Sequence, residues 1–286
     1  LLQPLASFCV AKSVVTCDDW REMSTTERPL SVDSVHVAPS DTAAGSAAGQ
    51  AAARLLQDAL SRRGRARVVF ASAPSQDRMI RTLSAAPGID WSRVESLHLD
   101  EYRGIDPEHR AGFGRWLADR LPSTALPGLR RIRTDGDARA EIERYGEVLD
   151  AAPVDLVCLG IGVNGHIAFN EPGDTDFADA ALLREVPLAH ASRQQQVDEG
   201  LFPALADVPT HALSLTVPAI LRGAAIVGTV LGAAKAEAVA AALVGPVTPD
   251  VPASVLRTHG AVSLFLDAAA ASRLPAAFPV TAVAGD

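Results

Sequence analysis

Helical and strand-like patterns of apolar and polar residues alternate along the chain from residue 40 onward. An alanine-rich pattern of helical period begins at Asp41, a residue type that caps helices, and runs to about residue 61. Short apolar runs rich in β-branched residues, with no helical period, indicate buried strands between such helices. These patterns predict strands at 67–71, 94–99, 154–159, 224–231 and 261–266, and helices near 112–121, 137–151 and 235–243.

Apolar strands that alternate with amphipathic helices are typical of a sheet covered on both faces. The predicted fold class is therefore α/β: a Rossmann-like three-layer fold with a mostly parallel sheet. The sequence contains no internal repeat and no low-complexity linker, so we expect one domain over residues 31–275. Residues 276–286, which follow Pro275, are expected to form a loose tail.

The N-terminal residues show neither period clearly. Residues 1–22 precede Met23 and a polar stretch typical of a protein start, so we hypothesise that they derive from an upstream start site. A signal peptide is the alternative, but a basic segment followed by a continuous apolar one is missing. Residues 1–30 are therefore expected to be disordered or to lie outside the folded domain.

Composition and charge exclude several function classes. The chain of 286 residues is 48% hydrophobic and 21% charged, as in globular proteins, and its formal net charge is −8. Nucleic acids and anionic membranes need a broad positive surface, so neither is an expected partner. No Cys-x-x-Cys, no His-Glu-x-x-His and no apolar run of about 18 residues is present. We predict a cytoplasmic protein without a metal.

The segment from Gly160 to Pro172 combines glycines with titratable side chains directly after a predicted strand. Its glycines allow close backbone approach to a ligand, and His166 can exchange a proton near neutral pH. Glu171 can orient or charge-balance that imidazole. By residue type alone, a structural turn with a hydrogen-bonded histidine is an equally good interpretation.

Two adjacent carboxylates, Asp100 and Glu101, follow another predicted strand. Successive strand residues point to opposite sides, so one carboxylate can enter a cleft as a base while the other turns to solvent or a partner. In isolation, such a pair is more often a loop or a helix cap.

Several residues could hold an anion. Ser72, Ser75 and Gln76 lie where a strand passes into a helix, whose N-terminal N–H groups favour phosphate. Arg193 lies in a polar stretch, and Lys235 begins a helix, where its charge opposes the helix dipole. Each cation could equally be a solvated surface charge.

Together these segments resemble the glucosamine-6-phosphate deaminase family and, more distantly, the 6-phosphogluconolactonases, over residues 68–267. The run Gly-His-Ile-Ala-Phe-Asn-Glu-Pro at 165–172 is long and specific for the deaminase branch. Further matches lie at Asp100-Glu-Tyr102, Ser192-Arg193, Pro209–Leu213, Leu231-Gly232 with Lys235, and Ser254–His259.

This resemblance implies a mechanism. His166, supported by Glu171 and Asn164, would open the pyranose ring, and Asp100 would move a proton between C2 and C1. A phosphorylated 2-amino aldose would thereby become a ketose phosphate and ammonia. The chemistry is acid–base throughout, so no cofactor is expected.

The resemblance also implies that Arg193 and Lys235 hold the phosphate with Ser72, Ser75 and Gln76. The family's phosphate turn has a Thr-Gly-Gly or Thr-Gly-Ser core, whereas residues 72–76 read Ser-Ala-Pro-Ser-Gln. With fewer glycines the backbone of this turn cannot approach a ligand as closely, so the identity of the sugar stays open.

Residues 174–183 lack the cations of the allosteric site in regulated relatives, so no activation by N-acetylglucosamine 6-phosphate is expected. Three alternatives remain: an aldose–ketose phosphosugar isomerase, a 6-phosphogluconolactonase-like hydrolase, and a non-catalytic sugar-phosphate-binding protein. A homo-oligomer also remains open.

Overall fold

A parallel sheet of seven strands forms the centre of residues 35–285, the part of the chain that the computed structural model describes. The expected N-terminal extension, residues 1–30, lies outside these residues. The strand order is β10-β1-β9-β8-β5-β2-β3, and every neighbouring pair is parallel. The strands are β1 (Val35–Ala38), β2 (Ala66–Phe70), β3 (Val94–His98), β5 (Leu156–Leu159), β8 (Ile226–Val230), β9 (Val262–Asp267) and β10 (Thr281–Ala282).

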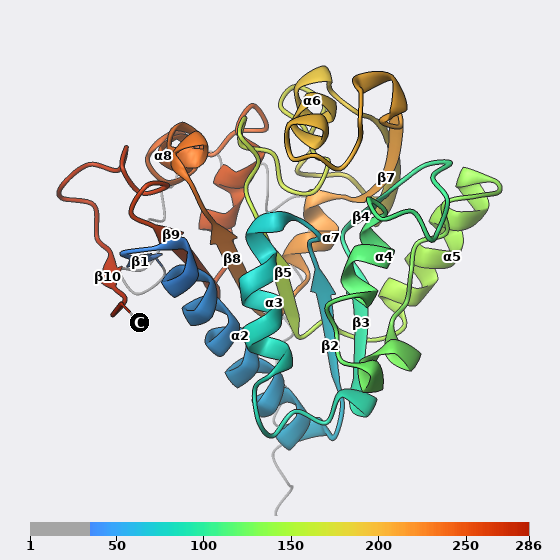
Figure 1. Cartoon of the computed structure of the whole chain (residues 1–286), viewed down its shortest axis with the longest axis horizontal. Helices are drawn as coiled ribbons and strands as arrows, with labels where there is room; N and C mark the ends of the chain where they lie inside the picture. The colour runs from blue at the N-terminus through green and yellow to red at the C-terminus, as the bar shows by residue number, and fades with distance from the viewer. Residues whose placement is uncertain (1–34, 286) are drawn as a thin grey trace, which may run out of the picture.

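Helices cover both faces of this sheet, because successive strand residues point to opposite sides. In β2, Val68 and Phe70 belong to the core cluster that includes residues of α2 and α3, whereas Val69 belongs to the cluster that includes residues of α5, α7 and α8. Figure 1 shows α2 and α3 side by side on one face. The predicted three-layer α/β fold is confirmed. The helices are α2 (Asp41–Arg63), α3 (Asp77–Ser84), α4 (Phe113–Ala118), α5 (Ala138–Asp150), α6 (His190–Asp198), α7 (Val217–Leu221) and α8 (Ala236–Val244).

Short 3₁₀ helices join several of these elements. Two of them, η3 and η7, follow β2 and β8 and lead into α3 and α8, so both lie at the carboxyl end of the parallel sheet. The 3₁₀ helices are η3 (Pro74–Gln76), η4 (Trp91–Arg93), η5 (Ser123–Gly128), η6 (Leu205–Asp207), η7 (Ala233–Lys235) and η8 (Pro252–Thr258).

A second, antiparallel sheet of β4 (Asp100–Tyr102), β7 (His211–Leu215) and β6 (Leu183–Pro187) lies beyond the end of β3 (Figure 1). The chain passes between the two sheets at Leu99. The Leu99 N–H donates to the carbonyl of Phe70 at 3.0 Å, and the Leu99 carbonyl accepts from Leu215 at 2.8 Å. The sequence pattern predicts one strand through residue 99, so this change of sheet is a correction. Asp100, the residue after Leu99, is therefore the first residue of β4.

Two element ends also differ from the sequence prediction. The N-cap of α2 is Ser40, whose hydroxyl accepts from the N–H of Ala43 at 3.1 Å, so Asp41 is instead the first helical residue. At the other end of the chain, residues 281–282 pair with β1 rather than forming a loose tail. Within residues 35–285 no helix is long and apolar enough to cross a bilayer.

Candidate active site

A cavity of about 640 Å³ opens at the carboxyl ends of the parallel strands. The residues that line it follow strands far apart in the sequence, as ligand sites in parallel α/β sheets do. Ser40 follows β1, Ser72 follows β2, Asp100 follows β3, Gly160 follows β5 and Gly232 follows β8. The parallel sheet therefore gathers the polar segments that the sequence analysis singled out.

Asp100 lines this cavity with a side chain that is almost buried, at 8% exposure. Among residues 35–285 no group donates a hydrogen bond to its carboxylate oxygens. Burial, together with the negative charge of Glu101, raises the pKa of Asp100 from 3.8 to about 8. A carboxyl with a pKa near neutral pH can both take and return a proton, as a proton shuttle must.

Glu101 points away from the cavity and holds the start of α4. Its Oε1 accepts from the N–H groups of Tyr102 and Phe113 at 3.0 Å each, and its Oε2 accepts from Gly114 at 2.8 Å. Burial raises the pKa of Glu101 above its usual value, although these hydrogen bonds oppose the shift. The side chains of Asp100 and Glu101 therefore point in opposite directions. Asp100 lines the cavity, and Glu101 binds the N–H groups at the start of α4. Phe113, which Glu101 positions, lines the cavity.

His166 lines the cavity and is backed by a buried carboxylate. Its Nδ1 lies 3.4 Å from Oε1 of Glu171, and Asn164 donates to the other carboxylate oxygen at 2.7 Å. The Ser192 hydroxyl also donates to Glu171. Burial alone would raise the pKa of Glu171, but the hydrogen bonds and charge of these neighbours lower it from 4.5 to about 2. Glu171 is thus an anion that can stabilise a positive charge on His166.

The loop around His166 has two unusual backbone features. A Cβ atom on Gly162 would lie 2.3–2.4 Å from three atoms of the His166 ring, so only glycine allows the ring to occupy this position. Ala168, in the same loop and on the cavity wall, has a φ of 51°, a left-handed conformation that residues with a Cβ rarely adopt. Such strain concentrates at functional sites.

The turn at residues 72–76 supplies hydroxyls to the cavity. Ser72 and Ser75 line it, but Gln76 is fully buried and its amide donates to Ser75 Oγ at 3.1 Å and to the carbonyl of Thr229 at 3.0 Å. The sequence analysis expected Gln76 to contact phosphate directly. It lies behind Ser75 instead, because its amide donates to the carbonyl of Thr229 on β8. Since Ser75 Oγ accepts from the amide, its own proton remains free for a ligand.

Of the two predicted cations, only Lys235 lines the cavity. Burial lowers the pKa of this half-buried lysine, and the charge of Glu199 opposes the shift. Arg193 lies on α6, which also presents Gln195 to the cavity, but its guanidinium donates to the carbonyls of residues 205 and 208 at 2.7 and 2.8 Å. The guanidinium of Arg193 therefore points to the loop after α6, where two carbonyls accept from it, and not to a phosphate as the sequence analysis expected.

Some lining residues were assigned no role from the sequence. Ser192, noted there only as a match to the family, donates to Glu171 across 21 positions. Phe113 on α4, Glu199 and Asp267 line the cavity without any local motif that could have identified them, because only the fold brings them to the site.

A model of the family described as glucosamine-6-phosphate isomerases/6-phosphogluconolactonase matches residues 39–264. The chain belongs to this family. The match includes every residue that lines the cavity, from Ser40 to Lys235, except Asp267.

Curated relatives are named as deaminases. Glucosamine-6-phosphate deaminase of Exiguobacterium sp. (strain ATCC BAA-1283 / AT1b) is 40% identical over 188 residues, which cover 65% of this chain and 72% of that protein. The enzyme of the same name from Streptococcus pneumoniae serotype 4 is 38% identical over 192 residues, with 65% and 78% covered.

Solved structures share the fold. A monomeric glucosamine-6-phosphate deaminase superposes with a TM-score of 0.77 at 27% identity, covering 84% of this chain and 99% of that one. The 6-phosphogluconolactonase of Trypanosoma brucei superposes with a TM-score of 0.69 at 16% identity, covering 85% and 99%. The second comparison supports the fold alone.

Proposed function

We propose that this protein is an enzyme that converts glucosamine 6-phosphate and water to fructose 6-phosphate and ammonia. The observation that carries the proposal is the placement of Asp100, with its raised pKa, and of His166, backed by anionic Glu171, on the wall of one cavity. Two acid–base groups with different environments suit a reaction made of successive proton transfers. A sugar-phosphate substrate also agrees with a cytoplasmic location.

The first step assigned to this site is ring opening. His166 transfers the proton of the C1 hydroxyl to the ring oxygen O5, so that the C1–O5 bond breaks and an open-chain aldehyde forms. The imidazolium present during the transfer is stabilised by the Glu171 carboxylate, which Asn164 and Ser192 hold in place.

Asp100 carries out the second step. As a carboxylate it removes the proton from C2 while O1 gains a proton, which gives an enol with a C1–C2 double bond. The Asp100 carboxyl then returns its proton to C1, and the C2 amine loses a proton, which leaves a C1 alcohol and an imine at C2. Water adds to this imine, the C–N bond breaks, and ammonia leaves with fructose 6-phosphate. The lack of hydrogen-bond donors to Asp100 among residues 35–285 suits this role, since a carboxylate without donors is a stronger base.

The phosphate is assigned to two other groups of the cavity wall, Lys235 and the 72–76 turn. Lys235 supplies a positive charge, and the Ser75 hydroxyl, oriented by Gln76, supplies a donor. To bind the phosphate, Arg193 would have to give up its hydrogen bonds to the backbone carbonyls of residues 205 and 208. The binding of the anion therefore rests first on Lys235 and the 72–76 turn.

The decisive experiment measures ammonia and fructose 6-phosphate in one incubation with glucosamine 6-phosphate. Equal amounts of both products are expected, and Asp100→Asn should abolish their formation while binding persists. A ketose phosphate without ammonia would instead identify an isomerase. Hydrolysis of 6-phosphogluconolactone would identify a lactonase, and binding without any turnover would identify a sugar-phosphate-binding protein.

A further inference from the structure

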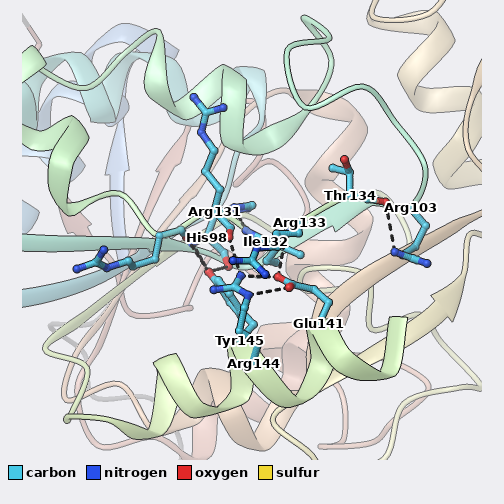
Figure 2. Close-up of polar contacts among 10 residues, drawn as sticks. His98, Arg103, Arg131, Ile132, Arg133, Thr134, Glu141, Arg144 and Tyr145 are labelled. Atoms are coloured by element: carbon cyan, nitrogen blue, oxygen red, sulfur yellow. Dashed lines mark hydrogen bonds and ion pairs between the residues drawn. The ribbon is translucent and has the colours of Figure 1, made fainter. Parts of the chain in front are cut away.

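An extended segment, residues 130–134, runs beside the last residues of β3 and is called the clamp segment below. Its first residue, Arg130, donates its N–H to the carbonyl of Ser96 at 2.8 Å, as a neighbouring strand would. Figure 2 shows side chains of α5, among them Glu141 and Tyr145, directed toward the clamp segment and His98. The clamp segment thus joins a surface helix to the end of the strand that precedes Asp100.

Helix α5 fixes the clamp segment from one face. Glu141 accepts from the N–H of Arg133 at 2.8 Å, and Arg144 donates to the carbonyl of Arg131 at 2.9 Å. Tyr145 completes this face, because residues spaced by three and four positions lie together on a helix. Glu141 and Tyr145 are both buried, and Glu141 is also paired with Arg144. A buried, fully bonded network of this kind is rigid.

The clamp segment holds the far end of β4. The carbonyl of Thr134 accepts from the N–H of Gly104 at 2.8 Å and from the side chain of Arg103 at 3.2 Å (Figure 2). Gly104 and Arg103 directly follow β4, whose first residue is Asp100. One end of this three-residue strand is therefore attached to the clamp segment through backbone and side-chain bonds.

His98 attaches the other end. Its Nε2 accepts from the N–H of Ile132 at 3.0 Å, and its Nδ1 lies 2.8 Å from the carbonyl oxygen of Asp100. An amide N–H can only donate and a carbonyl can only accept, so the ring is neutral and carries its proton on Nδ1. The Tyr145 hydroxyl accepts from the N–H of His98 and donates to its carbonyl, both at 3.0 Å. Every polar group of this fully buried residue is thus bonded.

We propose that His98 is a positioning residue that holds the backbone of Asp100 in register for proton transfer, through the Nδ1–H tautomer that the clamp segment imposes. The inference rests on the proposed role of Asp100 as the base. Asp100 is the first residue of β4, an edge strand: it pairs with Ser214 of β7 on one side, and within residues 35–285 no strand pairs with it on the other side. The imidazole bridges the gap between the clamp segment and the Asp100 carbonyl.

The substitutions His98→Asn and His98→Gln separate positioning from general stabilisation. The Asn amide nitrogen is as many bonds from Cβ as Nδ1, so it can still donate to Asp100 but cannot reach Ile132. The Gln amide reaches the position of Nε2, so it can accept from Ile132 but loses the bond to Asp100. Each variant keeps one of two hydrogen bonds, and their melting temperatures should fall by similar amounts.

The expected result is a difference in kcat. His98→Gln should lose up to about 100-fold in kcat with KM nearly unchanged, since displacing a catalytic group by about 1 Å has an effect of that size. His98→Asn should stay within about threefold of the unsubstituted enzyme, because an equivalent donor holds the Asp100 carbonyl. Equal kcat values in the two variants, or a loss that follows the melting temperatures, would overturn the proposal.

Nitrogen NMR of the histidine ring gives a second measurement that does not depend on turnover. The spectrum of the unsubstituted protein should show His98 protonated on Nδ1 and not on Nε2; the opposite tautomer would also overturn the proposal. In the same variants, the titration of the Asp100 carboxyl should shift for His98→Gln and not for His98→Asn. If the unsubstituted protein releases no ammonia, the proposed function fails, while these titrations still decide whether His98 positions Asp100.

Discussion

Replacing Gly162 by Ala should disable the ring-opening step while leaving the fold intact. The new Cβ would lie 2.3–2.4 Å from three ring atoms of His166, whereas carbon atoms in contact are about 3.5–4.0 Å apart. The imidazole must therefore move by more than about 1 Å, away from its position 3.4 Å from Glu171. Gly162 does not have a positive φ, so the alanine backbone itself is not strained.

A displacement of this size should lower kcat/KM by about 100-fold, which corresponds to about 2.7 kcal/mol of transition-state stabilisation. The assay is coupled ammonia release with glucosamine 6-phosphate. Gly146→Ala is the matched control: its Cβ would have no neighbour within 4 Å in helix α5, so activity should be unchanged and stability equal or higher. Normal kcat/KM in Gly162→Ala, measured beside that control, would refute the placement of His166 in the reaction.

Three further predictions concern the same cavity. The value of kcat/KM should rise with pH through about 8, where Asp100 ionises. The free energy of unfolding should fall between pH 3.8 and about 8, because the folded protein retains a proton on Asp100 that the unfolded chain has lost. A kcat/KM independent of pH from 6 to 9 would contradict the raised pKa on which both expectations rest. Ser75→Ala and Gln76→Glu should each raise KM about tenfold with little change in kcat, since the first removes a donor to a charged ligand and the second removes the amide N–H that orients this donor; an unchanged KM for either would place the phosphate elsewhere. N-acetylglucosamine 6-phosphate should not activate the enzyme, because residues 174–183 offer no cation of their own and Arg184 beside them is paired with Asp179; a rate increase in its presence would show a second site.

The sequence predicts the parallel sheet because its strands are continuous apolar runs, which have few other uses in a chain of this size. It does not predict the antiparallel sheet: β4 has only three residues, too few to show a period. Asp100 and His166 were recognisable as site residues from the resemblance to the deaminase family, and their positions after predicted strands agree with it, since such positions meet at one edge of the sheet.

Side-chain direction was harder to predict than position. Gln76 turns inward because an acceptor, the carbonyl of Thr229, lies beside it from a strand 153 positions away. Arg193 turns to the loop after α6 for a similar reason. The tautomer of His98 depends on an amide 34 positions further along the chain. These contacts are long-range, so no local pattern carries them.

The short strand β10 limits how the protein can be shortened. It covers the outer edge of β1, and the N–H of Val283 donates to the carbonyl of Val37 at 2.8 Å. Removing residues 276–286 as if they were a dispensable tail would leave β1 with unpaired backbone groups, the kind of edge to which a second chain can add. β1 also leads into Ser40, on the cavity wall, so trimming the C-terminus for crystallisation would promote aggregation and disturb the site together.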